Sequence, residues 1–197
     1  SLRSLYPVSS IYPRVLEELI MKLLVLYSSC EGQTLKIAKH IVAQQPQTDL
    51  SVDYQNLEQL QQAVNWSNYD KVLIGASIRY GKFRPHLYSL LAKYQQQLAN
   101  LPVAFFGVCL TARKPEKSTP ETSVYMKKLN QRAEWMPESQ AIFAGALLYS
   151  RYTWWQTRLI QMIMKMTGGS TDTSQDIELT DWSKVDDFAM HFAKLNK

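Results

Sequence analysis

Short apolar runs that alternate with segments of helical period constrain the fold of this chain more than any other feature. Four runs are apolar almost throughout, as is typical of strands buried on both faces, and they span residues 22–27, 70–76, 102–109 and 140–147. Weaker strand patterns occur at residues 50–54 and 177–180, and helical patterns at residues 33–45, 57–64, 85–98, 119–133 and 181–195. Thr119 and Asp181 are expected to cap the last two helices. The alternation predicts an α/β fold in which helices cover both faces of a parallel sheet.

The length of 197 residues indicates one domain with an appendage. Residues 1–20 differ from the rest, because two prolines interrupt any periodicity and no cleavage site follows an apolar stretch. We therefore expect an N-terminal extension rather than a signal peptide, with the working domain at residues 21–197. The segment at about residues 148–173 fits none of the strand and helix units and is interpreted as an insert.

The charge of the chain favours an anionic partner. Lys and Arg number 22 against 17 Asp and Glu, which gives a net charge of +5. A nucleic acid, a membrane surface and an acidic substrate all remain compatible with this excess. The two cysteines, Cys30 and Cys109, have no CxxC partner, so we expect neither a disulfide framework nor a metal site. A reducing cytosol suits them best.

The first predicted strand passes directly into a helix through the sequence Ser28-Ser29-Cys30-Glu31-Gly32-Gln33-Thr34. Hydroxyl groups and a flexible glycine here lie where free N–H groups and the positive end of a helix converge, which predicts an anion site. The loop is neither a Walker loop nor a GxGxxG fingerprint. Because it lacks a lysine, it would bind phosphate through neutral donors alone. The spacing by itself is equally compatible with an ordinary turn.

Residues 25–41 resemble the flavodoxin fingerprint at every defined position, in the pattern Val25-Leu26-Tyr27-x-Ser29-x-x-Gly32-x-Thr34-x-x-x-Ala38-x-x-Ile41. The resemblance implies a flavodoxin-like three-layer sandwich with a five-stranded parallel sheet in the order 2-1-3-4-5, and an insert after or within the last strand. It also implies that the loop holds the phosphate of FMN. The residues that would do so are Ser29, Cys30, Glu31, Gly32, Gln33 and Thr34.

Two further loops fall where flavodoxins hold the flavin ring, at the carboxyl ends of the second and third apolar strands. The residues expected there are Ser77, Ile78, Arg79, Tyr80 and Gly81 in one loop, and Val108, Cys109 and Leu110 in the other. Tyr80 would stack on the ring and Gly81 would let the backbone approach it. Arg79 would favour a reduced, anionic flavin or an acidic substrate. The alternatives are a packing aromatic for Tyr80 and a solvated charge for Arg79.

The insert combines aromatic, apolar and basic residues, namely Tyr149, Arg151, Tyr152, Trp154, Trp155, Arg158 and Lys165, with no acid before Asp172. On a helical wheel an apolar face formed by positions 155, 159, 162, 163 and 166 stands apart from a polar edge at 158, 161 and 165. This pattern is typical of a helix that lies in a lipid interface, and it is too short to span a bilayer. A core helix, a homodimer seam and a pocket lid are the alternatives.

Segments at residues 74–81, 112–117, 145–147 and 163–173 resemble the flavodoxin-type, quinone-dependent protoporphyrinogen dehydrogenases of bacteria. This narrower resemblance runs from Met21 almost to the end and leaves residues 1–20 outside it. It implies oxidation of protoporphyrinogen IX to protoporphyrin IX in haem biosynthesis, with electrons passing through FMN to menaquinone or ubiquinone. It further implies a peripheral enzyme at the cytoplasmic face of the inner membrane.

No side chain stands out as a catalytic acid or base, since His40, His86 and His191 all have ordinary surface or packing interpretations. Carboxylates of the substrate would pair with basic residues, for which the candidates are Arg79, Arg113, Lys114 and Arg151. Basic residues that sit among Trp and Met beside a flavin site favour lipid or porphyrin over nucleic acid. The rival functions are a NAD(P)H:quinone reductase, an electron-transfer flavodoxin and a non-catalytic flavin-binding or membrane-adaptor protein.

Overall fold

The computed structural model describes residues 20–46, 49–60 and 62–196, and a five-stranded parallel sheet forms its centre. The predicted N-terminal extension lies almost wholly outside the described residues. The strands are β1 (Met21–Ser28), β2 (Leu50–Asn56), β3 (Lys71–Ser77), β4 (Val103–Val108) and β5 (Ser139–Phe143). They lie side by side in the order β2-β1-β3-β4-β5, which confirms the predicted flavodoxin-like topology.

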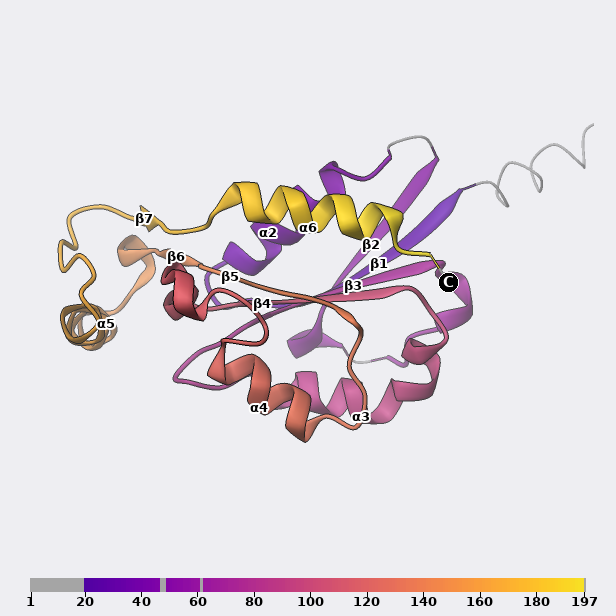
Figure 1. The fold of residues 1–197 in the computed structure, drawn as a ribbon, viewed down its shortest axis with the longest axis horizontal. Coiled ribbons are helices and arrows are strands. Elements are labelled where there is room, and N and C mark those ends of the chain that lie inside the picture. Colours follow the sequence, from indigo (N-terminus) through magenta and orange to yellow (C-terminus); the bar gives the residue numbers. More distant parts are fainter. Residues whose placement is uncertain (1–19, 47–48, 61, 197) are drawn as a thin grey trace, which may run out of the picture.

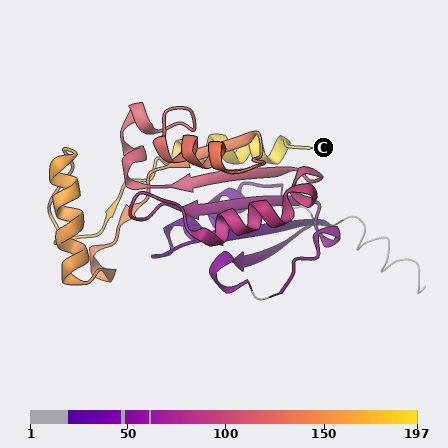
Figure 2. The ribbon, with the colours of Figure 1, turned by 90° about the horizontal axis from the view of Figure 1, so that it is seen from below.

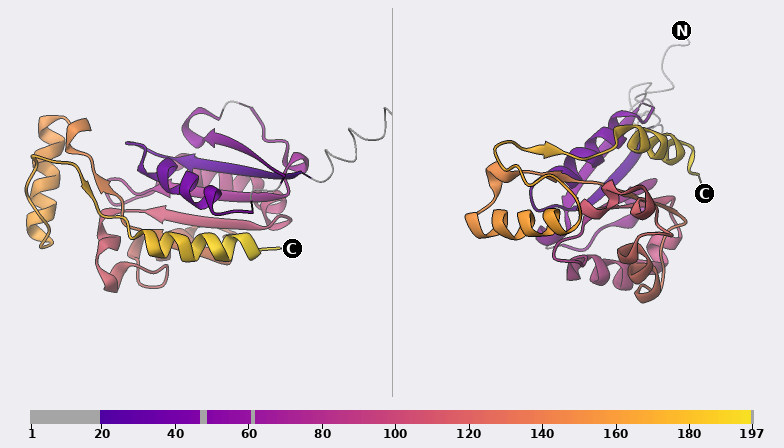
Figure 3. Two further views of the ribbon diagram at one scale, coloured as in Figure 1. Left: turned by 90° about the horizontal axis from the view of Figure 1, so that it is seen from above. Right: turned by 60° about the vertical axis from the view of Figure 1, so that its left-hand side comes forward.

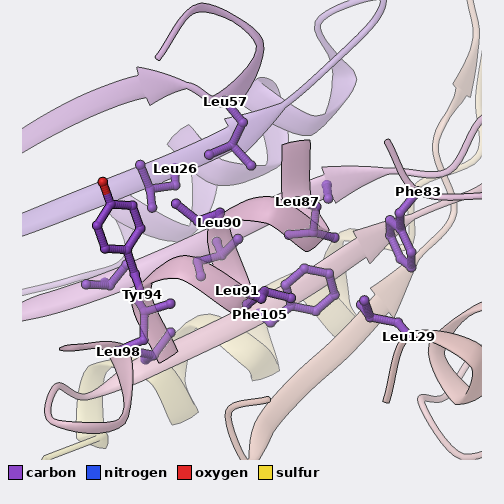
Figure 4. Close-up of a cluster of buried hydrophobic side chains, with 14 of the residues drawn as sticks. Leu26, Leu57, Phe83, Leu87, Leu90, Leu91, Tyr94, Leu98, Phe105 and Leu129 are labelled. Carbon is purple, nitrogen blue, oxygen red and sulfur yellow. The ribbon is translucent and has the colours of Figure 1, made fainter. Parts of the chain in front are cut away.

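Two helices cover each face of the sheet, as Figure 1 shows. One face carries α2 (Gln33–Ala43) and α6 (Trp182–Lys194), and the other carries α3 (Pro85–Ala99) and α4 (Val124–Arg132). Successive side chains of a strand point to opposite faces. Phe105 therefore packs into the core beneath α3 (Figure 4), and Phe106 packs into the core beneath α2 and α6. The sheet therefore separates two apolar cores. Both phenylalanines are fully buried.

Gly75 on β3 makes room for this packing. A Cβ atom added to Gly75 would lie 2.3 Å from the ring of Phe106 on the neighbouring strand. At the opposite end of β3, the buried ammonium group of Lys71 donates to the carbonyl of Phe192 at 2.7 Å and so holds the C-terminal end of α6 against the sheet. Burial lowers the pKa of Lys71.

The predicted insert contains a helix, α5 (Trp154–Met166), which stands across the carboxyl ends of the strands (Figures 2 and 3). Its two flanks are tied together, because β6 (Ala146–Leu147) pairs antiparallel with β7 (Ile177–Glu178). The insert thus follows the last strand of the main sheet. Among the described residues, no helix is long and apolar enough to cross a membrane.

Three local predictions were wrong. The apolar run at 140–147 is two strands, since the chain leaves the sheet after Phe143 and Thr180 donates to the carbonyl of Ala144 at 2.9 Å. The helix expected at 57–64 is a single 3₁₀ turn, η1 (Leu57–Gln59). Thr119 closes a separate turn, so α4 begins later, with the Ser123 side chain accepting from the N–H of Met126.

Candidate functional site

A cavity of about 270 Å³ lies at the carboxyl ends of the strands, between the sheet and α5. The loops that follow β1, β3 and β4 form its inner walls, and α5 forms its outer wall. The α5 side chains that face it are Gln156, Leu159, Ile160 and Ile163. The position matches the rule that ligands of open α/β sheets bind beyond the carboxyl ends of the strands, where the strand order reverses.

The loop after β1 is built to receive an anion. Gly32 adopts a left-handed conformation (φ 95°) that favours glycine, and its N–H donates to the hydroxyl of Ser29 at 3.0 Å. The first amide of α2 with an acceptor in the helix is that of Lys36, which bonds to the carbonyl of Gly32. The N–H groups of residues 33–35 therefore precede the first helical hydrogen bond and point towards the helix start.

Thr34 and Gln33, two side chains of this loop, differ in whether they are available to a ligand. Thr34 lines the cavity, and its hydroxyl makes no hydrogen bond to any residue that the structure describes. The amide of Gln33, in contrast, is turned towards β7 and bonds to Glu178 and to the hydroxyl of Thr180. Thr34 is thus available to a ligand, whereas the Gln33 side chain braces the loop and leaves its backbone to contact one.

Two arginines surround Glu31, the acidic residue of the loop. Arg79 forms an ion pair with the Glu31 carboxylate at 3.0 Å, and Arg151, from the segment before α5, donates to the Glu31 carbonyl. A Cβ added at Gly32 would lie 3.4 Å from the Arg151 guanidinium. The expectation that only neutral donors serve this loop was therefore incomplete, because the insert brings a cation to it. The ion pair also shows that Arg79 is not simply a solvated charge.

A polar cluster supports the loop from the side of α3. Arg84 donates to the thiol of Cys30 at 2.7 Å and pairs with Glu58 at 2.9 Å, while Ser28 donates to the same carboxylate. His86 lies 3.2 Å from Glu58. Burial acts to raise the pKa of Glu58, but the Ser28 hydrogen bond and the Arg84 ion pair outweigh it, so the pKa lies below its ordinary value. Glu58 is thus an anion that orients Arg84.

The loop after β3 makes a tight turn at the mouth of the cavity. The backbones of Arg79 and Lys82 exchange two hydrogen bonds, at 3.0 and 3.2 Å, and the two residues between them both have positive φ. Tyr80 sits at the tip with 61% of its surface exposed. Its strained backbone (φ 50°) and exposed ring are typical of a residue held for contact rather than for packing. The packing interpretation of Tyr80 does not fit this exposure.

The loop after β4 contributes an apolar and neutral wall. Cys109 is buried there and lies 3.2 Å from the hydroxyl of Thr111. Burial raises the pKa of the Cys109 thiol, which is consequently neutral at physiological pH. Arg113 bonds to the carbonyl of Leu110 and to Thr167, and so fastens the end of α5 to this loop.

The helix α5 has an inner and an outer face. Met164 is buried against Leu147 and Tyr149, and a Cβ at Gly169 would collide with it at 2.2 Å. The outer face exposes Met166 with 79% of its surface accessible, and Trp154 is exposed (78%) on the basic side of the helix. Trp155, Met162 and Ile163 are also exposed. Of the apolar face predicted at 155, 159, 162, 163 and 166, Leu159 and Ile163 line the cavity.

The structure brings most of the expected binding residues to one cavity. Those that line it are Ser29, Cys30, Glu31, Gln33, Thr34, Ser77, Ile78, Arg79, Tyr80, Gly81, Val108, Cys109, Leu110 and Tyr152. Gly32 shapes the loop without lining the cavity. The remaining residues singled out in the insert, Tyr149, Arg151, Trp154, Trp155, Arg158 and Lys165, do not line it either. The cavity is also lined by residues that were not predicted to bind a ligand, including Thr111, Tyr125, Gly145 and Ala146. The one sign of them in the sequence is that each lies near a strand end or a helix start.

Comparison with known proteins places the chain in a family. A family model described as "Flavodoxin domain" matches residues 24–174, a range that includes α5. A protoporphyrinogen IX dehydrogenase (quinone) of Escherichia coli strain K12 is 41% identical over 175 residues, which cover 89% of this chain and 96% of that protein. The chain belongs to this family of flavodoxin-domain dehydrogenases. A protein of Leishmania major with the same name is 42% identical over 88% of this chain and 75% of its own length.

Solved structures support the same fold. A short-chain flavodoxin associated with a bacterial microcompartment superimposes with a TM-score of 0.51 and 11% identity, covering 90% of this chain and all of the flavodoxin. At that identity the match speaks for the fold alone. The family membership therefore rests on the family model and the curated relatives, and the three-layer architecture agrees with both.

Proposed function

We propose that the protein is an FMN-dependent protoporphyrinogen IX dehydrogenase that passes electrons to a membrane quinone, menaquinone or ubiquinone. The observation that carries the proposal is the 41% identity to a protein of that name over nearly the whole of both chains. The reaction converts protoporphyrinogen IX and three quinones into protoporphyrin IX and three quinols, which balances six electrons and six protons. FMN, when bound, would supply the two-electron transfer between the two organic partners.

The residues at the cavity fit FMN. Free N–H groups at the start of α2 and the Ser29 and Thr34 hydroxyls suit a phosphate dianion. Arg151 does not line the cavity, but its guanidinium lies beside Gly32 and adds a positive charge near the same loop. The loops that carry Tyr80 and Cys109 offer an aromatic ring and a neutral, apolar wall to a flat heterocycle. These residues bind and orient, and none of them needs to carry a proton for that task.

The outer wall supports a role at a membrane surface. α5 exposes Met162 and Met166 on the same apolar side as Leu159 and Ile163, which line the cavity, and it exposes Trp154 on its basic side. A helix with exposed aromatic and apolar side chains, flanked by Arg158 and Lys165, is suited to lie in an anionic lipid interface. Lipid-soluble quinone would then reach the cavity along the same helix. On this ground we propose that the enzyme is a peripheral protein on the cytoplasmic face of the inner membrane.

The proposal is tested by asking which electron donor the protein oxidises, protoporphyrinogen IX or NADH. The purified protein, loaded with FMN and kept anaerobic, is mixed with menaquinone and either protoporphyrinogen IX or NADH. Formation of fluorescent protoporphyrin IX without consumption of NADH supports the proposal. Consumption of NADH with no porphyrin formed would instead identify a NAD(P)H:quinone reductase.

A further inference from the structure

A second, basic groove adjoins the cavity on the side of α4. It has a volume of about 390 Å³ and lies between the loop after β3 and α4. Its lining residues are Gly81, Lys82, Phe83, Tyr88, Tyr125, Lys128, Gln131 and Arg132. We propose that this groove binds the carboxylates of the tetrapyrrole substrate. The inference rests on the proposed function and locates where its substrate is held.

The groove and the main cavity share a boundary. Gly81 and Tyr125 line both of them, and a Cβ at Gly81 would lie 3.8 Å from the Tyr125 ring. Because Gly81 has no side chain, its backbone and the Tyr125 ring form the shared boundary of the two spaces. A ligand wider than the main cavity would therefore extend across Gly81 into the groove.

The charge of the groove is entirely positive. Lys82, Lys128 and Arg132 line it, and no acidic residue does. Over the described part of the chain, none of these three side chains forms an ion pair with a carboxylate. Three cations without an anionic partner among these residues favour an anionic ligand.

The basic residues nearer the main cavity are already engaged. Arg79 pairs with Glu31, Arg84 with Glu58, and Arg113 bonds to Leu110 and Thr167. A substrate carboxylate at any of them would have to displace a partner of the protein itself. Arg79 and Arg113, which were candidates from the sequence, are therefore weaker candidates for binding a substrate carboxylate than the cations of the groove are.

The groove also presents a geometry suited to a carboxylate. The guanidinium of Arg132 lies over the ring of Tyr88, 4.5 Å from its centroid, which restrains the side chain. None of the residues that the structure describes bonds to its N–H edge, which can donate two parallel hydrogen bonds to a carboxylate. Phe83 is buried beneath the groove, and Tyr88 and Tyr125 line it as well. Aromatic walls and a cationic rim match an apolar macrocycle that carries acidic side chains.

Protoporphyrinogen IX has this distribution of charge. Its two propionate groups lie on neighbouring pyrroles at one edge of the macrocycle, and the opposite edge carries only apolar groups. With the propionates in the groove, the apolar part of the macrocycle would extend over Gly81 into the main cavity beside Tyr80. The groove would thus orient the substrate as well as bind it.

Charge-reversal variants of α4 test the proposal. Protoporphyrin IX, which carries the same two carboxylates, is titrated into the FMN-loaded protein and followed by its fluorescence. Lys128→Glu and Arg132→Glu are each expected to weaken its binding at least tenfold, and Lys128→Arg to stay within about twofold of the unaltered protein. Lys127→Glu is the matched control, because Lys127 lies on the same helix but lines no part of the groove.

The dimethyl ester of protoporphyrin IX provides the chemical control. It lacks the two charges, so its affinity is expected to be the same in all variants, as is the affinity for FMN. If Lys128→Glu and Arg132→Glu bind protoporphyrin IX as tightly as Lys127→Glu does, the proposal is wrong. Loss of binding to phosphatidylglycerol vesicles with porphyrin affinity unchanged would also overturn it, by making the groove a lipid contact.

The failure of this proposal differs from the failure of the proposed function. If the groove does not bind substrate, the unaltered protein still oxidises protoporphyrinogen IX and the variants keep its KM. If the proposed function is wrong, the unaltered protein does not oxidise protoporphyrinogen IX at all.

Discussion

The guanidinium of Arg151 donates a hydrogen bond to the backbone carbonyl of Glu31, across 120 residues of sequence. The contact joins the segment before α5 to the loop after β1 and places a permanent positive charge beside Gly32. A loop that otherwise offers N–H and hydroxyl groups thereby gains a cation. The insert is consequently part of the anion site and not only a surface feature.

Replacement of Arg151 by alanine is expected to weaken the binding of FMN about tenfold, because one charge-assisted interaction of about 1.4 kcal/mol is lost. Riboflavin has the same ring but no phosphate, so its affinity should be unchanged. Flavin fluorescence quenching measures both. Arg158→Ala is the control, since Arg158 is exposed on α5 and has no partner among the described residues. Equal weakening of FMN and riboflavin would contradict a phosphate contact by Arg151.

A second prediction concerns the left-handed backbone at Gly32. Alanine at this position is expected to lower the free energy of unfolding by about 1 kcal/mol, because its Cβ disfavours positive φ. Gly168 has a similar φ of 71° with open space around it, so Gly168→Ala should cost about the same stability. Only Gly32→Ala should also weaken FMN binding. Urea denaturation measures the loss of stability, and flavin titration measures the affinity for FMN. An unchanged FMN affinity in Gly32→Ala would contradict the binding of FMN by this loop.

The low pKa of Glu58 predicts a pH dependence of stability. A carboxyl whose folded pKa lies below its ordinary value of 4.5 stabilises the fold fully above that value, and this contribution is lost as pH falls through the folded pKa. At pH 7, Glu58→Gln is expected to lower the free energy of unfolding by about 1 kcal/mol, since Arg84 loses its partner. The difference should shrink as the pH falls below 4.5 and through the folded pKa.

Urea denaturation at pH 7 and pH 3.5 measures this effect. Glu121→Gln serves as the control, because Glu121 is an exposed carboxylate without a partner among the described residues, and its effect should be near zero at both values. A Glu58→Gln penalty that is the same at pH 7 and pH 3.5 would show that the ionised carboxylate does not stabilise the fold.

Membrane binding should depend on the outer face of α5. Met166→Glu is expected to reduce binding to phosphatidylglycerol vesicles at least tenfold, because it removes an exposed apolar side chain and adds a charge that anionic lipid repels. Met190→Glu on α6 is the matched control, since Met190 is also exposed. Vesicle co-sedimentation measures both variants. Equal loss in the two would mean that net charge, and not α5, governs binding.

Much of the fold follows from patterns that are local in sequence. Continuous apolar runs identified β1, β3 and β4, and the change to helical spacing identified α2 and α3. The strand order followed from the resemblance to flavodoxins, not from periodicity. Errors arose where one local pattern is compatible with two structures. The apolar run at residues 140–147 could be one strand or two, and in the structure its last part leaves the main sheet and pairs with β7.

The candidate site was predictable only in the parts that adjoin a strand end. The loops at Ser29, Tyr80 and Cys109 follow apolar strands directly, and parallel strands bring their carboxyl ends to one edge. The contacts of Arg151 with Glu31 and of Arg113 with Thr167 join distant segments, and nothing in the spacing of residues encodes them. The groove beside Tyr125 likewise needs the packing of α4 against a loop 40 residues away in sequence.

The most direct test of the account is the stoichiometry of the anaerobic reaction. The FMN-loaded protein is given protoporphyrinogen IX and an excess of menaquinone, and porphyrin fluorescence and quinol absorbance are followed together. The account predicts that three menaquinols form for each protoporphyrin IX. When quinone is omitted, at most one third of a protoporphyrin IX should form per FMN, because one FMN accepts only two of the six electrons. Porphyrin formation at the uncatalysed rate, with quinone present and FMN bound, would contradict it.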